Sequence, residues 1–148
     1  MSSNVDREAT EWGAYQEPTQ HYLTPESTTG PEISTPSMAT VLETVLDLRS
    51  QELAVYDAIT ADPGASTKAL ASTLDRDRSN VNRSLTKLEA AGLVARHRRI
   101  LDSGGFYYAN YAAPNDVVDE VVSTALDQWL MDARSTVDEH QWDGALTD

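Results

Sequence analysis

The sequence contains no cysteine among its 148 residues. This absence excludes disulfide bonds, thiolate catalysis, zinc sites built on thiolates and redox sensing by thiols. No apolar run approaches the roughly 18 residues that cross a bilayer, so the sequence offers no transmembrane helix. The first residues, Met1 to Arg7, have no apolar signal core. We therefore expect a cytoplasmic protein that is neither exported nor held in a membrane.

Motifs for metal binding and catalysis are also lacking. The three histidines, His21, His97 and His140, lie in separate segments without a second ligand at helical spacing, so no metal site is predicted. The pair Gly104-Gly105 fits a turn better than a phosphate-binding loop, and no nucleophile motif is present. No carboxylate lies in an evident apolar pocket that would tune it for acid–base work. We expect no enzymatic activity and no cofactor.

Positive charge is scarce and unevenly distributed. The net charge is -13, and only two lysines accompany nine arginines, a composition that resembles the acidic proteins of extreme halophiles. Eight of these eleven basic residues lie between Ser66 and Ala112, which hold four acids and carry a net charge of +4. A local cationic region in an acidic chain is typical of nucleic-acid binding, although solvated helix faces are the plain alternative.

The N-terminal segment, residues 1–36, predicts an acidic and flexible tail. Its last part, residues 24–36, is rich in proline, serine and threonine and has one large apolar residue, so it cannot bury enough surface to offset ordering entropy. Trp12, Tyr15 and Tyr22 are exceptions that are either partly ordered aromatics or contacts to the domain or to a second subunit.

The middle of the chain, residues 37–113, predicts a compact domain of four helices followed by two strands. Apolar residues recur at helical spacings, then the pattern becomes strand-like around the hairpin turn signal Asp102–Gly105. Asp77 is expected to cap the fourth helix with its carboxylate, and Gly92 to end it. The expected ranges are 37–49, about 50–61, 66–74 and 78–91 for the helices, and 93–100 and 106–112 for the strands.

This order of elements, over about residues 50–112, resembles the winged helix-turn-helix of the MarR-like and TrmB-like transcription regulators of archaea and bacteria. The most specific part is the ending Leu85-x-x-Leu88-Glu89-x-x-Gly92-Leu93-Val94. The resemblance implies a mainly α fold with a small β-hairpin wing, and a sequence-specific DNA-binding transcriptional regulator. The chain departs from the family in its long acidic tail and in having no recognisable effector domain.

The helix from Arg78 to Ala91 is the expected recognition helix. Val81, Leu85 and Leu88 recur at i, i+4 and i+7 and must face the core, which turns polar side chains outward. Arginine, asparagine and small hydroxyl residues are what a major groove reads. The residues expected to contact bases are Arg78, Ser79, Asn80, Asn82, Arg83 and Thr86.

The hairpin is expected to add contacts to the DNA backbone or the minor groove. Strand alternation places Arg96 and Arg98 on one face and His97 and Arg99 on the other. The alternative is a charged strand that only protects a sheet edge. The aromatic residues of the second strand are expected to serve the hairpin and the core. The residues expected to contact the DNA backbone are Ser66, Lys68, Arg76, Lys87, Arg96, Arg98 and Arg99.

The C-terminal region, residues 114–148, predicts a long helix over 115–139, about 37 Å in length. Its apolar stripe is too long for a small domain to cover, so we expect it to pair with the same helix of a second copy, with or without the helix over 37–49. The alternative is an ordinary core helix. The residues expected at the dimer interface are Val118, Val121, Val122, Ala125, Trp129 and Ala133.

The expected partners are therefore double-stranded DNA and a second copy of the chain, with salt cations possible between acidic side chains and phosphates. A symmetric dimer would present two recognition helices to a pseudo-palindrome. The rival interpretation is a winged helix that binds protein in the transcription machinery. Apolar residues on the exposed side of the recognition helix would favour that rival.

Overall fold

The computed structural model describes residues 34–144 and residue 146. The described residues from Pro36 onward belong to one unit. The predicted flexible tail lies almost wholly outside the described residues, as do Trp12, Tyr15, Tyr22 and His21.

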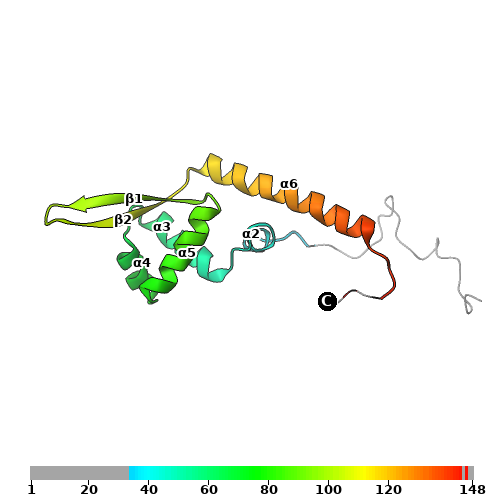
Figure 1. Cartoon of the computed structure of the whole chain (residues 1–148), viewed down its shortest axis with the longest axis horizontal. Coiled ribbons are helices and arrows are strands. Elements are labelled where there is room, and N and C mark those ends of the chain that lie inside the picture. Colours follow the sequence, from blue (N-terminus) through cyan, green and yellow to red (C-terminus); the bar gives the residue numbers. More distant parts are fainter. Residues whose placement is uncertain (1–33, 145, 147–148) are drawn as a thin grey trace, which may run out of the picture. The chain divides into compact units, whose positions relative to one another are not determined.

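The described chain forms five helices and one antiparallel hairpin, so the predicted mainly α fold with a β-hairpin wing and a long C-terminal helix is confirmed. Helices α3, α4 and α5 gather near the base of the hairpin, whose tip extends beyond them (Figure 1). The elements are α2 (Met38–Leu46), α3 (Ser50–Ala61), α4 (Thr67–Leu74), α5 (Arg78–Ala90), β1 (Val94–Leu101), β2 (Gly105–Ala112) and α6 (Asn115–Glu139).

Helix α2 is shorter than the sequence predicts. It begins after Ser37, whose hydroxyl oxygen accepts a hydrogen bond from the Thr40 amide at 3.1 Å. It ends at Leu46 because Asp47 adopts a left-handed conformation with φ 55°. Leu48, in the link that follows, is fully buried. The turn between α2 and α3 is therefore anchored in the core.

The core is built on the inward edge of α5. Val81, Leu85 and Leu88 are fully buried, as the helical spacing predicts. Val55 and Ile59 of α3, also fully buried, belong to the same apolar cluster. Burial of one edge of α5 against α3 turns the opposite edge of this helix toward solvent.

The hairpin is joined to the helices by a short strand-like pairing. Residues 64–66 run beside β2, with the Gly64 amide donating to the Asn110 carbonyl at 2.8 Å and the Asn110 amide to the Ala65 carbonyl at 3.1 Å. Gly64 has φ +88°, and a Cβ there would lie 3.1 Å from the Tyr111 hydroxyl oxygen. Glycine at this position thus permits the approach of the α3–α4 link to β2.

Helix α6 is not an ordinary core helix, because none of its residues is buried. Val118 and Val121 pack beside the core, while Leu126 and Trp129 line an apolar groove with residues of α2. Leu130 remains 53% exposed. Over residues 34–144 and 146, no helix is both long enough and apolar enough to cross a membrane.

The substitution Leu85→Ala tests the packing of α5. We expect it to lower the free energy of unfolding by about 2–5 kcal/mol, because it removes buried apolar surface and leaves a cavity. Urea denaturation followed by circular dichroism measures this change. The matched control Glu89→Ala, on the exposed side of the same helix, should change stability by less than about 0.5 kcal/mol. Equal effects of the two substitutions would contradict the assigned orientation of α5.

Candidate nucleic-acid interface

The outward edge of α5 is polar and free of carboxylates. Ser79, Asn82, Arg83 and Thr86 are exposed there, and the only acidic residue of the helix is Glu89, near its end. Asp77 occupies the N-cap position, but its carboxylate makes no capping hydrogen bond, so that expectation is wrong.

A hollow of about 700 Å³ lies between the start of α4, the start of α5 and the hairpin. Three of its lining residues are cationic and, in the part of the chain that the structure describes, none is acidic. Its lining residues are Ser66, Thr67, Lys68, Arg78, Ser79, Asn82, Arg96, Phe106, Tyr107 and Tyr108. The hollow therefore combines positive charge, hydroxyl groups and aromatic rings.

Arg96 is the polar link between the helices and the wing. Its Nε donates to Oδ1 of Asn110 at 3.1 Å, and its Nη2 donates at 3.2 Å both to Oγ1 of Thr67 and to Oδ1 of Asn82. These acceptors belong to β2, α4 and α5 in turn. Arg96 is predicted from the sequence to donate hydrogen bonds to DNA phosphates, but most of its donors are used within the protein.

The face of the hairpin that carries Arg96 and Arg98 alternates cations with rings. The guanidinium carbon of Arg96 lies 5.0 Å from the centre of the Tyr108 ring, and that of Arg98 lies 4.2 Å from the Phe106 ring. Phe106 and Tyr108 meet edge to face at 5.7 Å. Phe106, Tyr107 and Tyr108 belong to the hairpin as predicted, but they are exposed, so the expectation that they also serve the core is wrong for these three. Phe106 and Tyr108 instead support arginine side chains.

His97 and Arg99 lie on the other face of the hairpin, as strand alternation predicts. Nη2 of Arg99 donates to the Tyr111 hydroxyl at 2.8 Å, and the His97 ring meets the Tyr111 ring edge to face. The hydrogen bond to Tyr111 raises the pKa of Arg99.

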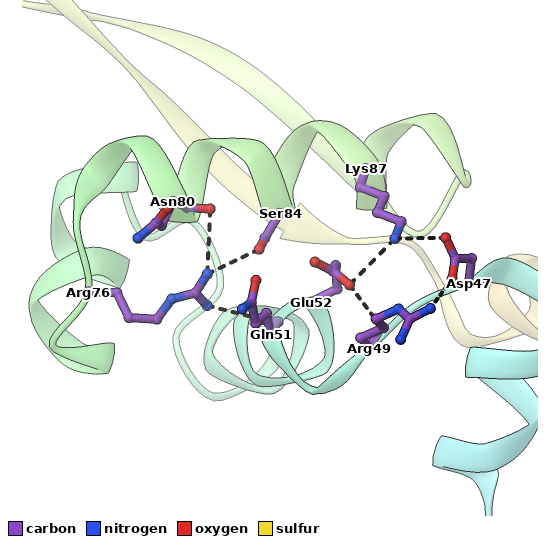
Figure 2. Close-up of polar contacts among 8 residues, drawn as sticks. All are labelled: Asp47, Arg49, Gln51, Glu52, Arg76, Asn80, Ser84 and Lys87. Carbon is purple, nitrogen blue, oxygen red and sulfur yellow. Dashed lines mark hydrogen bonds and ion pairs between the residues drawn. The ribbon is translucent and has the colours of Figure 1, made fainter.

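Arg76 forms a polar bracket, that is, a set of hydrogen bonds that links α5 to α3 (Figure 2). Its Nη1 donates to the Gln51 carbonyl at 3.1 Å, and its Nη2 donates to the Asn80 carbonyl at 3.5 Å and to Oγ of Ser84 at 3.3 Å. Ser84 is only 2% exposed. The side chain predicted to contact phosphate thus satisfies groups inside the domain.

Lys87 forms a second bracket toward the other end of the helix (Figure 2). Its ammonium group lies 3.4 Å from a carboxylate oxygen of Asp47 and 3.7 Å from one of Glu52. Glu52 is buried and also accepts the Arg49 amide at 2.8 Å. Lys87 therefore points to the α2–α3 link and away from the outward edge of α5.

The other expected contact residues fall into two groups. Ser66 caps α4 by accepting the Ala69 amide at 3.0 Å, and Arg83 donates to Oδ1 of Asn80 within α5. The side chains of Lys68, Arg78 and Ser79 make no hydrogen bond or ion pair with any described residue. These three line the hollow with their polar groups available.

The comparisons with known proteins agree with this geometry. The family model described as "Sugar-specific transcriptional regulator TrmB" matches residues 42–114. Over this stretch, just under half of its length, the chain is similar to the TrmB family, and its fold is a winged helix. That family is described as one of transcriptional regulators. The match ends where α6 begins, so it covers the winged helix and not the C-terminal helix.

Several proteins similar to this chain come from archaea. A possible transcriptional regulator from Methanosarcina mazei Go1 superposes with a TM-score of 0.60 at 24% identity, covering 70% of this chain and 87% of that one. The ST1889 protein of Sulfolobus tokodaii gives a TM-score of 0.51 at 18% identity, over 63% of this chain and 91% of that one. The uncharacterised protein MJ1503 of Methanocaldococcus jannaschii is 26% identical over 102 residues, covering 69% of this chain and 77% of its own length.

Asn110 and Thr67 are residues of this site that sequence reasoning missed. Asn110 is fully buried, and its Nδ2 donates to the Ala65 carbonyl at 2.9 Å. A signal was present, because counting back from the hairpin turn pairs Arg96 with Asn110. Thr67 had no such signal, since only the tertiary fold brings α4 to the hairpin.

The substitution Arg76→Ala tests whether this arginine holds the domain together. We expect the free energy of unfolding to fall by about 1–3 kcal/mol, because Ser84 and the Gln51 carbonyl lose their donor. Urea unfolding without DNA measures the effect. Arg78→Ala is the matched control, with an expected change under about 0.5 kcal/mol. A stability unchanged by Arg76→Ala would show that the bracket contributes nothing.

Proposed function

We propose that this regulator binds double-stranded DNA sequence-specifically, with α5 in the major groove and the hairpin on the backbone or in the minor groove. The observation that carries the proposal is the cationic hollow between α4, α5 and the hairpin, whose described lining residues include no carboxylate. A DNA duplex is a polyanion, and the net charge of -13 on the whole chain would otherwise repel it. Such a surface gives an acidic protein one place at which phosphates are attracted.

Base reading falls to the outward edge of α5. Ser79, Asn82, Arg83 and Thr86 are exposed on this edge, and Arg78 stands at its start. A major groove about 12 Å wide admits a helix and presents donors and acceptors to side chains of these types. Asn80 contributes through Arg83, because its Oδ1 accepts from that guanidinium.

Backbone contacts fall to residues that surround this edge. Lys68 lies at the start of α4, and its ammonium group makes no ion pair with a described residue. Arg98 and Arg99 extend from opposite faces of β1. With an arginine on each face of β1, the hairpin suits a position along the DNA backbone. It also suits a narrow minor groove, whose negative potential attracts arginine. Ser66 contributes at the start of α4, where its hydroxyl already caps the helix.

The second candidate function is binding to a protein of the transcription machinery. The observation that favours it is the apolar tip of the hairpin, where Ile100 is 79% and Leu101 45% exposed. The outward edge of α5 argues the other way, because Ser79, Asn82, Arg83 and Thr86 are all polar. DNA is therefore the better-supported partner.

We also propose that the regulator is a homodimer that uses α6. Val122, Ala125 and Ala133 are only half-buried, and Leu130 is 53% exposed, so a broad apolar face of this helix is left without cover. Trp129 is 43% exposed although it lines the groove with α2. A second copy of α6 would cover this face and place two recognition helices on one duplex.

The acidic residues outside the cationic region 66–112 affect how the protein would bind DNA in concentrated salt. In molar salt, release of counterions from DNA is a weak driving force, so hydrogen bonds and shape would carry a larger share of affinity. We propose that salt cations bridge some carboxylates to phosphates under those conditions. The acidic surface would then repel nonspecific DNA while the target stays bound.

Arg83→Ala and Arg98→Ala test the division between base and backbone contacts. Loss of Arg83 should cost about 1–3 kcal/mol on the preferred sequence and relax sequence preference. Loss of Arg98 should weaken binding to all sequences alike and flatten the salt slope by about one unit. Electrophoretic mobility shifts on a selected and a random duplex over a salt series measure both. Equal losses on random DNA would contradict the division.

Ala133→Glu tests the dimer. The two residues Ala133 and Ser135 lie on different sides of α6, because residues two apart do not face the same way. A carboxylate at 133 should shift the protein toward a monomer, since it introduces charge into the apolar face. Ser135→Glu, the matched control, should leave the mass unchanged. Sedimentation equilibrium measures both, and a monomeric wild-type protein or a dimeric Ala133→Glu variant would refute the interface.

A further inference from the structure

The amide of Asn82 has one defined orientation. Nη2 of Arg96 lies 3.2 Å from Oδ1 of Asn82. An arginine side chain has donors only, so the atom of Asn82 that faces it must be the oxygen and not the nitrogen. The amide NH₂ group of Asn82 is therefore directed away from Arg96, on the exposed edge of α5.

The position of Arg96 is in turn fixed by buried residues of the domain. Its Nε donates to Oδ1 of Asn110, which is fully buried, and the Asn110 amide donates to the Ala65 carbonyl. Thr67 accepts from the same nitrogen of Arg96 that bonds Asn82, and the Tyr108 ring lies against the guanidinium. If Arg96 turned toward solvent, it would leave the buried Asn110 oxygen without a donor, which is unfavourable. The chain of contacts runs from the core of the domain to the edge that reads DNA.

This orientation limits what Asn82 can recognise. An asparagine that reads adenine uses its oxygen and its nitrogen together, because the adenine edge presents a donor beside an acceptor. Arg96 occupies one of the two lone pairs of the Asn82 oxygen, and its positive charge opposes a second donor there. The groups of Asn82 that stay fully available are therefore its two N–H donors. In the major groove guanine presents two acceptors, O6 and N7, and thymine presents the acceptor O4, whereas adenine sets the N6 donor beside its N7 acceptor, where it opposes an N–H donor.

We infer that Arg96 is a specificity-determining positioning residue, which holds the Asn82 amide so that it reads a keto base, guanine or thymine, in preference to adenine. The inference rests on the proposed function and changes the part that Arg96 plays in it from a phosphate contact to a partner of Asn82. Arg98, two residues along the same strand face, has no side-chain hydrogen bond to a described residue and keeps the phosphate role.

Selection of binding sites from a randomised duplex pool tests the inference with the full-length protein. Asn82→Ala identifies the base position that Asn82 reads, as the one whose preference it abolishes. The wild-type protein should prefer guanine or thymine there. Arg96→Ala should reduce that preference about tenfold and admit adenine, while the salt slope on the selected duplex stays the same. Arg98→Ala, the matched control, should keep the preference and lose about one unit of slope.

A double-mutant cycle separates positioning from a general structural effect. In the Asn82→Ala background, Arg96→Ala should leave base preference unchanged, because the group that it orients is gone. Arg96→Lys, which keeps a donor for Asn82, should restore part of the preference. Thermal melting of each variant shows whether it folds. If Arg96→Ala does not fold, Arg96→Lys is compared with the wild-type protein instead, and it should keep only part of the base preference.

Two results would overturn the inference while leaving DNA binding intact. One is a wild-type preference for adenine at the position of Asn82. The other is an Arg96→Ala variant with unchanged preference and a reduced salt slope, which would make Arg96 a phosphate ligand. A wild-type protein that enriches no duplex from the pool would instead refute the proposed function.

Discussion

Burial of one edge of α5 is the constraint on which the interface depends. Val81, Leu85 and Leu88 enter the core completely, and a helix that buries these positions must turn Ser79, Asn82 and Arg83 outward. Apolar burial gives this orientation its strength, because it is the largest favourable term available to a small domain. The polar brackets from Arg76 and Lys87 then lock the helix along α3 (Figure 2).

The positive charge of the central region has two different uses. Arg76, Lys87 and Arg96 satisfy acceptors or carboxylates inside the domain, whereas Lys68 and Arg78 make no polar side-chain contact with described residues. A count of basic residues therefore overstates the charge that the surface offers to DNA. The reason is that Ser84, Glu52 and Asn110 are buried, and burying each of these polar side chains without a charged partner would cost free energy.

The hairpin both holds its arginines against aromatic rings and contacts the exposed side of α5. On one face of the hairpin, arginines alternate with the rings of Tyr108 and Phe106, and one of these arginines reaches Asn82 on α5. A stacked guanidinium keeps its plane and loses less freedom on binding than a solvated one. The hairpin and α5 thus form a single polar surface rather than two independent ones.

The sequence by itself determined the elements and the outward edge of α5, because helical and strand periodicity are local and because cap and turn residues such as Ser66 and Gly92 act on their own segments. It also indicated which residues carry positive charge. Only the tertiary structure decided which of those charges face solvent. Arg96 meets Asn82 and Thr67 through contacts between elements far apart in the chain, and side-chain partners at such separations leave no periodic signal.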